Sequence, residues 1–291
     1  MKNFLLYLLV FLLAVSCRTS GDALDKPVIS VSIIPQQYFI EQLAGDLVEV
    51  NVLIPPGASP ATYEPSVSQL GKLDRSEVYL RIGYVGFEQS WMEKLISVNP
   101  DMKIVDLSEG VEIILDNAGE EEGHHGHSYE GGDPHIWMSV INARIIASNI
   151  HKELLLLFPG EKEYLQARFD LFYQSLDSLH LEISSELEGI VNRKFMIYHP
   201  ALTYYARDYG LEQFSLEIEG KTPSPAHLKE MTDLAIHHQI SKILIQDQFD
   251  RRNAEVLASE TGADIIQFDP LDLKWGEQMR YIALQFKTSI Q

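Results

Sequence analysis

Two sets of short, β-rich apolar runs, separated by one long amphipathic segment, constrain the fold of this 291-residue chain more than any other feature. The first set has expected strands at 28–34, 48–54, 78–82 and 103–107, with helical patterns at 36–44, 67–73 and 88–98. The second set has expected strands at 195–198, 243–245 and 265–268, with helices beginning at Ala201, Pro225, Asn253 and Glu277. Strands that alternate with helices predict βαβ units and mostly parallel sheets.

The segment 161–191 between the two sets is expected to form one connecting helix. Its apolar residues recur every three or four positions, as a helix with one buried face requires: Leu165, Phe169, Phe172, Leu176, Leu179, Ile183 and Leu187. About 28 helical residues span about 42 Å, which is long for a helix inside one α/β domain, although that alternative stays open. We therefore predict an α/β fold with two lobes, 27–160 and 192–291, each with a mostly parallel sheet flanked by helices and joined by one long rigid helix.

The N-terminal segment has the composition of an export signal. Lys2 precedes an apolar run of about 12 residues, whereas a membrane span needs about 20. Residues 1–16 are therefore expected to be a signal peptide, and 17–26 a flexible tether. The sequence up to Cys17 resembles a bacterial lipoprotein signal, so Cys17 is the expected lipidation site. This predicts an exported protein, lipid-anchored at the cell envelope in the periplasm or at the cell surface; the alternative is a soluble secreted protein with a free thiol.

Charge and cysteine content exclude several partners and sites. The chain has 42 acidic and 23 basic residues and a formal charge of −19, so it should repel nucleic-acid phosphates and attract cations. A single cysteine cannot build a zinc finger or an iron–sulfur cluster. A bound metal would therefore be held by histidines and carboxylates.

Three residues in turn-like positions could form such a site. His135 follows Pro134 and precedes a helical pattern that begins at Val140. His199 and Asp269 each directly follow an expected strand, and open α/β sheets bind ligands at the carboxyl ends of their strands. Two histidines and one carboxylate suit Zn²⁺ or another first-row divalent ion. The same residue types also cap helices and form hydrogen bonds in turns, so this pattern alone does not settle the site.

The stretch 119–133, GEEEGHHGHSYEGGD, is the one low-complexity part of the chain. Its glycines and carboxylates cannot pack a core, so it is expected to be a mobile loop. His124, His125 and His127 lie beside these carboxylates and are expected to capture divalent ions weakly and reversibly, within an accessory loop at 119–130. The alternative is a solvated acidic loop without a binding role.

Several separate motifs occur in the order typical of one family. They extend over residues 28 to 286 and include Pro56-Gly57-Ala58-Ser59-Pro60 before Tyr63-Glu64-Pro65, Asp133-Pro134-His135-Ile136-Trp137, His199-Pro200-Ala201, Glu260-Thr261-Gly262 and Phe268-Asp269-Pro270-Leu271. The chain thereby resembles the metal-binding solute-binding lipoproteins of zinc and manganese ABC transporters. The resemblance implies two α/β lobes joined by a long helix, with one metal held in the cleft by His135, His199 and Asp269.

The resemblance also implies what the protein binds and where it delivers the ion. A histidine-rich loop resembles the zinc-specific branch of the family, so Zn²⁺ is the expected ion, with Mn²⁺ or Fe²⁺ as alternatives. The expected partner is the membrane permease of an ABC transporter, and the protein is expected to act as a monomer and not as an enzyme.

The chain departs from the family pattern at Ala61. The family's first ligand is a histidine in this loop, and an alanine side chain cannot coordinate a metal. Water, Glu64 or a histidine of the loop 119–130 could take that position, or the site could be three-coordinate or inactive. Glu64 also has a structural alternative, because the family often carries a glutamate before that proline.

Two other functions remain open at this stage. Three protein ligands plus water is the arrangement of a catalytic zinc, so a zinc-dependent hydrolase with Glu64 or Asp247 as general base is conceivable. The chain, however, has no His-Glu-x-x-His or Gly-x-Ser-x-Gly motif. The other alternative is a surface adhesin that retains the metal-binding fold.

Overall fold

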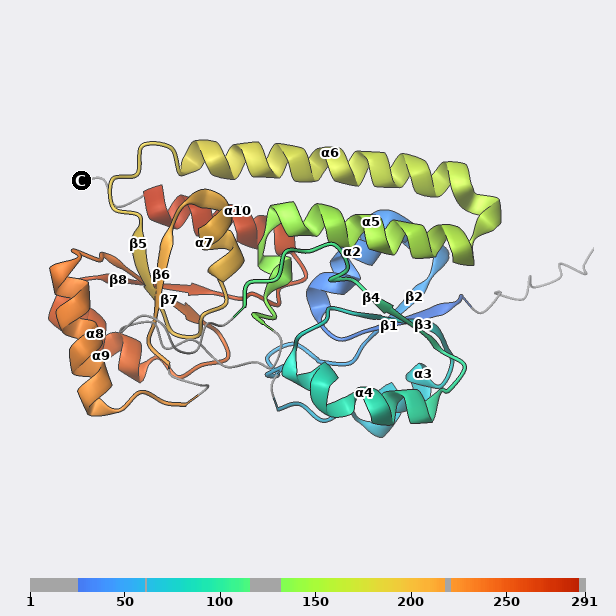
Figure 1. Cartoon of the computed structure of the whole chain (residues 1–291), viewed down its shortest axis with the longest axis horizontal. Helices are drawn as coiled ribbons and strands as arrows, with labels where there is room; N and C mark the ends of the chain where they lie inside the picture. The colour runs from blue at the N-terminus through green and yellow to red at the C-terminus, as the bar shows by residue number, and fades with distance from the viewer. Residues whose placement is uncertain (1–25, 61, 116–131, 218–220, 288–291) are drawn as a thin grey trace, which may run out of the picture.

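The computed structural model describes residues 26–60, 62–115, 132–217 and 221–287. The predictions for the signal peptide, Cys17, Ala61 and the loop histidines His124, His125 and His127 lie outside these residues. Within them, two parallel four-stranded sheets are flanked by helices, and one long helix runs along both (Figure 1). The predicted fold class is confirmed.

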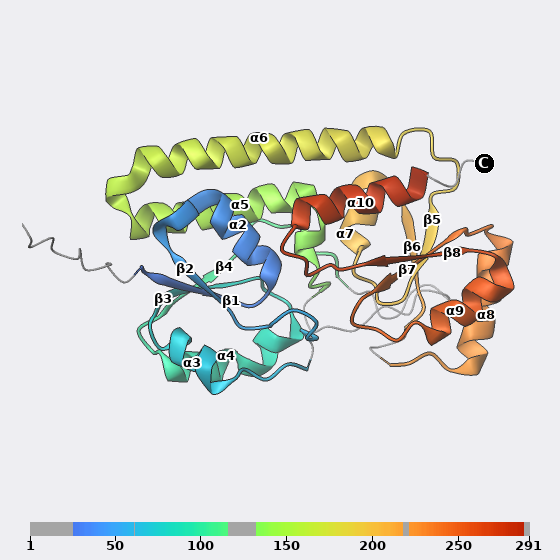
Figure 2. The ribbon, with the colours of Figure 1, turned by 180° about the vertical axis from the view of Figure 1, so that it is seen from behind.

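The first sheet has the strand order β2-β1-β3-β4. Its strands are β1 (Val28–Val31), β2 (Glu49–Val52), β3 (Ser76–Arg81) and β4 (Lys103–Asp106). Its helices are α2 (Ile34–Ala44), α3 (Val67–Leu73), α4 (Gly86–Val98) and α5 (Val140–Leu157), with α3 and α4 on one face and α2 and α5 on the other (Figures 1 and 2). Ile29 of β1 lies opposite both Val50 and Val78, and all four residues of β1 are buried, so this central strand is covered on both faces.

The second sheet repeats this topology with the order β6-β5-β7-β8. Its strands are β5 (Lys194–Ile197), β6 (Glu212–Ser215), β7 (Lys242–Gln246) and β8 (Asp264–Phe268). Its helices are α7 (Thr203–Tyr209), α8 (Pro225–His237), α9 (Arg252–Thr261) and α10 (Trp275–Lys287). Strand β6 was not predicted from the sequence, because this edge strand reads Glu-Gln-Phe-Ser and buries only Phe214. An edge strand with polar side chains gives no continuous apolar run.

The long helix α6 (Lys162–Glu186) packs against α2 and α5 of the first lobe and α10 of the second. It buries the predicted apolar face, including Phe172 and Leu179. The helix ends five residues before the predicted limit at 191, because Gly189 adopts a φ of 77°, outside the helical region. Three 3₁₀ turns, η1 (Gly45–Leu47), η2 (Ile136–Met138) and η3 (Pro159–Glu161), complete the regular structure of the described residues.

One hydrophobic core continues from the first lobe into the second beneath α6. At its centre the ring of Phe39 in α2 meets that of Trp275 in α10 edge to face, with 5.0 Å between the centroids, and Phe172 of α6 lies 5.9 Å from Phe39. A smaller core, including Met196, Met231 and Leu257, fills the other face of the second sheet. Because close-packed interiors resist shear, this shared core holds the two lobes in a fixed relation. None of the described helices is long and apolar enough to cross a membrane.

The end of β1 is tied to the start of α4 by Glu88, a carboxylate that is only 2% exposed. It accepts hydrogen bonds from the backbone N–H groups of Ile82 and Gly83, at 2.8 Å each, and from the hydroxyl of Ser32. Burial raises the pKa of Glu88 to about 7, although these three hydrogen bonds act in the opposite direction.

Replacing Glu88 by glutamine is expected to change how stability depends on pH. In the folded chain Glu88 keeps its proton up to a pKa of about 7, whereas the ordinary value is 4.5, so parent stability falls as pH rises between these values. The variant cannot ionise at this position. Between pH 4.5 and about 7, its free energy of unfolding should therefore rise by about 3 kcal/mol relative to that of the parent. Urea unfolding from pH 4.5 to 8 measures the difference. Glu93→Gln, an exposed position on the same helix, should follow the parent; an E88Q profile parallel to the parent would contradict the prediction.

Candidate metal centre

A cavity of about 190 Å³ lies between the lobes at the carboxyl end of the second sheet. The first lobe contributes Ser59, Pro60 and Val85, the second contributes Gln248, Phe249 and Leu271, and both His135 and His199 line it. His199 follows β5 and Gln246 ends β7, and between these two strands the strand order reverses. This is the position at which open α/β sheets bind ligands.

His135 is held in the turn that precedes η2. It is 7% exposed, and its Nδ1 lies 2.8 Å from Oδ1 of Asp133, which also accepts the backbone N–H of His135 at 2.8 Å. Burial alone would raise the pKa of Asp133, but the charge and hydrogen bonds of His135 outweigh it, and the pKa lies below its usual value. Asp133 therefore fixes the orientation of the imidazole and favours the tautomer with its proton on Nδ1.

His199 is held in the same way from the second lobe. Its Nδ1 lies 2.8 Å from Oε1 of Glu217, whose residue is only 2% exposed. The side-chain amide of Gln246 brackets the backbone of His199, donating to its carbonyl at 2.6 Å and accepting from its N–H at 3.3 Å. Phe249 stacks on the imidazole with 5.4 Å between centroids. The ring is thus fixed at its backbone, its Nδ1 and one face.

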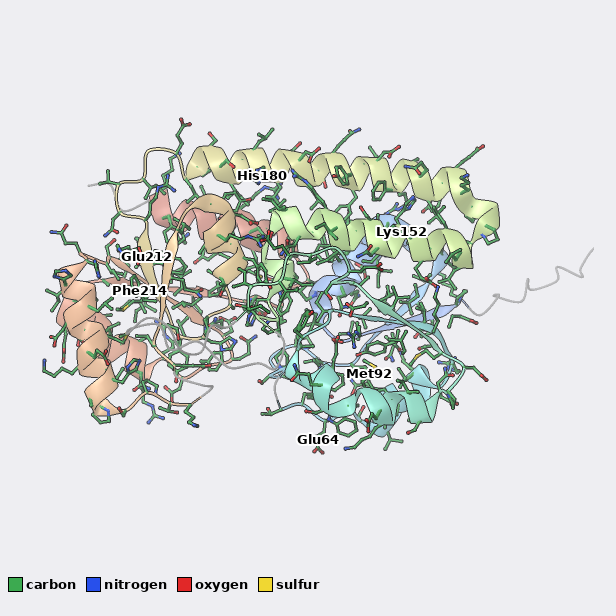
Figure 3. All side chains as sticks on the ribbon, viewed as in Figure 1. Glu64, Met92, Lys152, His180, Glu212 and Phe214 are labelled. Atoms are coloured by element: carbon green, nitrogen blue, oxygen red, sulfur yellow. The ribbon has the colours of Figure 1, made fainter. Side chains whose placement is uncertain are left out.

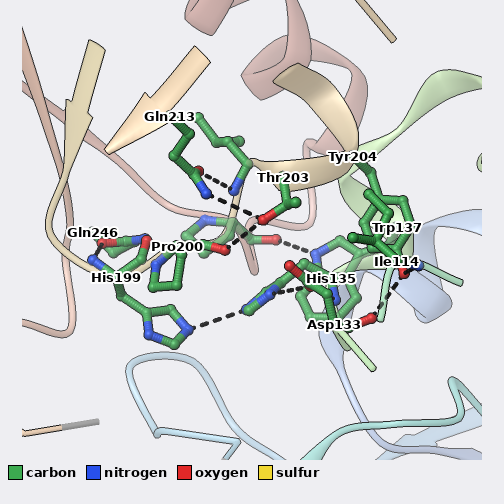
Figure 4. Close-up of polar contacts among 12 residues, drawn as sticks. Ile114, Asp133, His135, Trp137, His199, Pro200, Thr203, Tyr204, Gln213 and Gln246 are labelled. Carbon is green, nitrogen blue, oxygen red and sulfur yellow. Dashed lines mark hydrogen bonds and ion pairs between the residues drawn. The ribbon is translucent and has the colours of Figure 1, made fainter. Parts of the chain in front are cut away.

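The two imidazoles point their remaining nitrogens at each other (Figure 4). Nε2 of His135 and Nε2 of His199 are 3.2 Å apart. Because each Nδ1 faces a carboxylate, each imidazole in its neutral form would present an Nε2 lone pair, and two facing lone pairs favour a cation between them. At a Zn–N distance of about 2.0–2.1 Å, this separation corresponds to an N–Zn–N angle of about 100°, close to tetrahedral. The pair therefore has the spacing of two ligands of one zinc ion.

Asp269, the third predicted ligand, lies at the end of β8, and the structure does not group it with the two histidines. Its Oδ1 accepts hydrogen bonds from the side chain of Gln248 and the backbone N–H of Leu271, at 2.9 Å each. Gln248 and Leu271 both line the cavity, so Asp269 stands directly behind the cavity wall. Within the described ranges, no cluster of three or more His, Cys, Asp or Glu residues has metal-binding geometry.

The other residues weighed from the sequence lie elsewhere. Glu64 is exposed and lies at the outer margin of the first lobe (Figure 3), and Asp247 is exposed at the end of β7. Neither lines the cavity. His180 faces the hydroxyl of Tyr209, and His227 faces Glu230 of its own helix, as expected for histidines with structural roles.

Trp137 packs beside the site and joins the lobes. Its ring lies 5.2 Å from that of His135, and its Nε1 donates to the carbonyl of Pro270 at 2.8 Å. Trp275 in turn donates from Nε1 to the carbonyl of Trp137 at 2.8 Å. Because Pro270 adjoins Asp269, these two bonds fix the position of the His135 turn relative to the end of β8.

The roles of Asp133 and Glu217 beside the two histidines were not predicted from the sequence. Asp133 does carry a local signal in the sequence. In a turn, an aspartate side chain commonly accepts the backbone N–H of the residue two positions later, which here is His135. The sequence gives no comparable signal for Glu217 unless strand β6 is recognised. Once this strand is recognised beside β5, Glu217 and His199 follow neighbouring parallel strands and are expected to meet.

A two-lobed α/β fold with facing imidazoles between its lobes defines a class of metal-binding proteins. The chain matches the family described as "Zinc-uptake complex component A periplasmic" over residues 29–288, and it belongs to that family.

Individual relatives agree with this family. A crystal structure of ZnuA is 36% identical, with a TM-score of 0.83, covering 91% of this chain and 99% of that one. A ZnuA deletion mutant with zinc bound is 37% identical, with a TM-score of 0.82, covering 92% and 100%. The zinc-binding lipoprotein AdcA of Streptococcus pneumoniae (strain ATCC BAA-255 / R6) is 29% identical over 300 residues, which include 98% of this chain. The chain spans only 59% of the length of AdcA.

Proposed function

We propose that this protein binds Zn²⁺ in the cavity between its lobes and delivers it to the membrane permease of an ABC transporter for import. The observation that carries the proposal is the 3.2 Å separation of the Nε2 atoms of His135 and His199, each backed by a buried carboxylate. Membership of the zinc-uptake family and the zinc-bound ZnuA relative support the same ion.

The proposed zinc ligands are His135, His199 and Asp269. The two imidazoles are already oriented, so binding costs little side-chain ordering. Asp269 would reach the ion by a change of its side chain, because its Oδ1 is now bonded to Gln248 and Leu271. Two nitrogens and one carboxylate oxygen form a donor set typical of zinc. The histidines at 124, 125 and 127 are proposed to capture ions for the site.

The proposed location is the cell envelope. Residues 1–16 would be removed as a signal peptide, Cys17 would carry the lipid, and 17–26 would serve as a tether. The protein would then present residues 27–160 as the first lobe, 161–191 as the connecting segment and 192–291 as the second lobe, acting as a monomer. AdcA and related lipoproteins support this location by their names. Because the core is shared between the lobes, release of zinc would involve small lobe shifts and loop movement.

A zinc titration tests the proposal. The metal-free protein is titrated with Zn²⁺ and Mn²⁺ by calorimetry, in parallel with His135→Ala and with a variant lacking residues 119–130. We expect zinc to bind at one strong site that survives the loop deletion and is lost in His135→Ala. His227→Ala is the matched control, since His227 is also buried and faces a carboxylate, but lies outside the cavity. Equal zinc affinity in the parent and His135→Ala would refute the site.

No observation on the described residues favours the hydrolase or the adhesin alternative. A catalytic zinc needs a general base within reach of its bound water, and both Glu64 and Asp247 are exposed outside the cavity lining. The family description also names an uptake component and not an enzyme.

A further inference from the structure

The cavity around the two imidazoles is larger than a zinc ion requires. Its volume of about 190 Å³ corresponds to about six water molecules at ~30 Å³ each. If His135, His199 and Asp269 bind zinc as proposed above, a tetrahedral ion has one open position, which a single water could fill. The structure therefore leaves space for something larger than water beside the ion.

The walls of this space favour an organic ligand over a cluster of waters. They are mostly apolar, with Pro60, Val85, Pro134, Phe249 and Leu271 among the lining residues. A water molecule in a cavity needs two to four polar partners. The amides of Gln246 and Gln248 also line the cavity, but they are bonded to His199 and Asp269, so waters beside the apolar walls would find few partners. Two aromatic rings stand beside the ligands, Trp137 next to His135 and Phe249 next to His199. A flat, ring-shaped ligand would pack against these surfaces.

The charges around the proposed zinc ion favour a second ligand that is itself uncharged. Asp133, Glu217 and Asp269 place three carboxylates around a doubly charged ion, and no Lys or Arg is among the described residues that line the cavity. An anionic ligand would add a further negative charge in a poorly solvated space, which is unfavourable without a cationic partner. A neutral nitrogen donor completes the coordination of zinc without this cost.

We propose that the cleft takes zinc together with a small, net-neutral molecule that carries an imidazole-type nitrogen donor. The inference rests on the proposed zinc-binding function and adds the chemical class of the second ligand. The donor nitrogen would occupy the open position on zinc, and its ring would lie against the apolar walls beside Phe249 and Trp137.

Calorimetric titration of the metal-free, full-length protein with zinc tests the inference, with imidazole as the probe and acetate as the anionic control. At an imidazole concentration about ten times its own dissociation constant for the zinc-loaded site, the zinc affinity should rise about tenfold. Native mass spectrometry should then show one zinc and one imidazole on each chain, and this species should be absent for His199→Ala. Acetate should give no gain.

A gain-of-donor variant provides the matched comparison. Position 61 is where the resemblance places the family's histidine ligand, and its sequence neighbours Pro60 and Thr62 both line the cavity, so Ala61→His is expected to supply an imidazole donor from the chain. This variant should bind zinc more tightly than the parent without imidazole and gain nothing when imidazole is added. If added imidazole raises the zinc affinity of Ala61→His as much as that of the parent, the imidazole binds elsewhere and the inference fails.

The remaining outcomes separate this inference from the proposed function. If zinc binds equally well with and without imidazole, the inference fails and the zinc-binding function stands. If deletion of residues 119–130 removes zinc binding in the absence of imidazole, that segment supplies the donor and the inference fails. If the protein binds no zinc, either without imidazole or with it, the proposed function itself fails.

Discussion

Replacing Asp133 by asparagine and Glu217 by glutamine is expected to lower the affinity for zinc by about 10- to 100-fold for each substitution. Each carboxylate lies 2.8 Å from the Nδ1 of a candidate ligand, Asp133 beside His135 and Glu217 beside His199. An amide at the same place can present its NH₂ group to Nδ1, which favours the proton on Nε2 and removes the lone pair that would bind zinc. Calorimetric zinc titration of each variant measures the loss.

The control for this prediction is Glu230→Gln. Glu230 also faces a histidine Nδ1, that of His227 at 3.3 Å, but the pair lies on α8 away from the cavity lining. Its replacement should leave zinc affinity unchanged. The prediction fails if D133N and E217Q bind zinc as tightly as this control, because the carboxylates would then only stabilise the fold.

Replacing Trp275 by alanine is expected to reduce the free energy of unfolding by about 3–5 kcal/mol. Its side chain is 1% exposed and packs edge to face on Phe39, at the place where the cores of the two lobes join. Removal would leave a large cavity and an unpaired carbonyl on Trp137. Guanidinium unfolding measures the change. Trp91→Ala, which alters a partly buried ring stacked on Phe87 within one lobe, should cost clearly less.

Trp275→Phe removes the hydrogen bond with a smaller loss of packing than Trp275→Ala. The variant keeps a six-membered aromatic ring and loses the five-membered ring with its donor to Trp137, so its stability should fall by about 1–3 kcal/mol. Because Trp137 lies two residues from His135, zinc affinity should fall as well. A stability loss in W275F without any change in zinc affinity would show that this bond does not position the His135 turn.

Much of the fold could be read from residue patterns. The apolar runs that became β1, β3, β5 and β7 are buried on both faces, and such strands show continuous hydrophobicity in the sequence. The seven-residue apolar stripe of the connecting segment likewise predicted α6, because a periodicity near 3.6 is a local property. The edge strand β6 was missed, since its polar side chains carry no such signal.

The candidate site was predictable only in part. His135 and His199 were selected because each lies in a short turn beside a regular element, and a family resemblance assigned them the same role. Their spacing, however, depends on β5 and η2 being brought together from opposite lobes, 64 residues apart in the chain. No local pattern encodes an interatomic distance of 3.2 Å across that separation.

The sequence alone determined the two-lobed α/β architecture, the acidic character that disfavours nucleic acid and the residue types available to hold a metal. The tertiary structure alone decided that the two imidazoles face each other, that Asp133 and Glu217 stand behind them, and that the described part of the cavity wall is mostly apolar. The physical reason is that periodicity and turn chemistry act between near neighbours. Coordination geometry instead depends on packing across the shared core, in which Trp137 and Trp275 fix one lobe against the other.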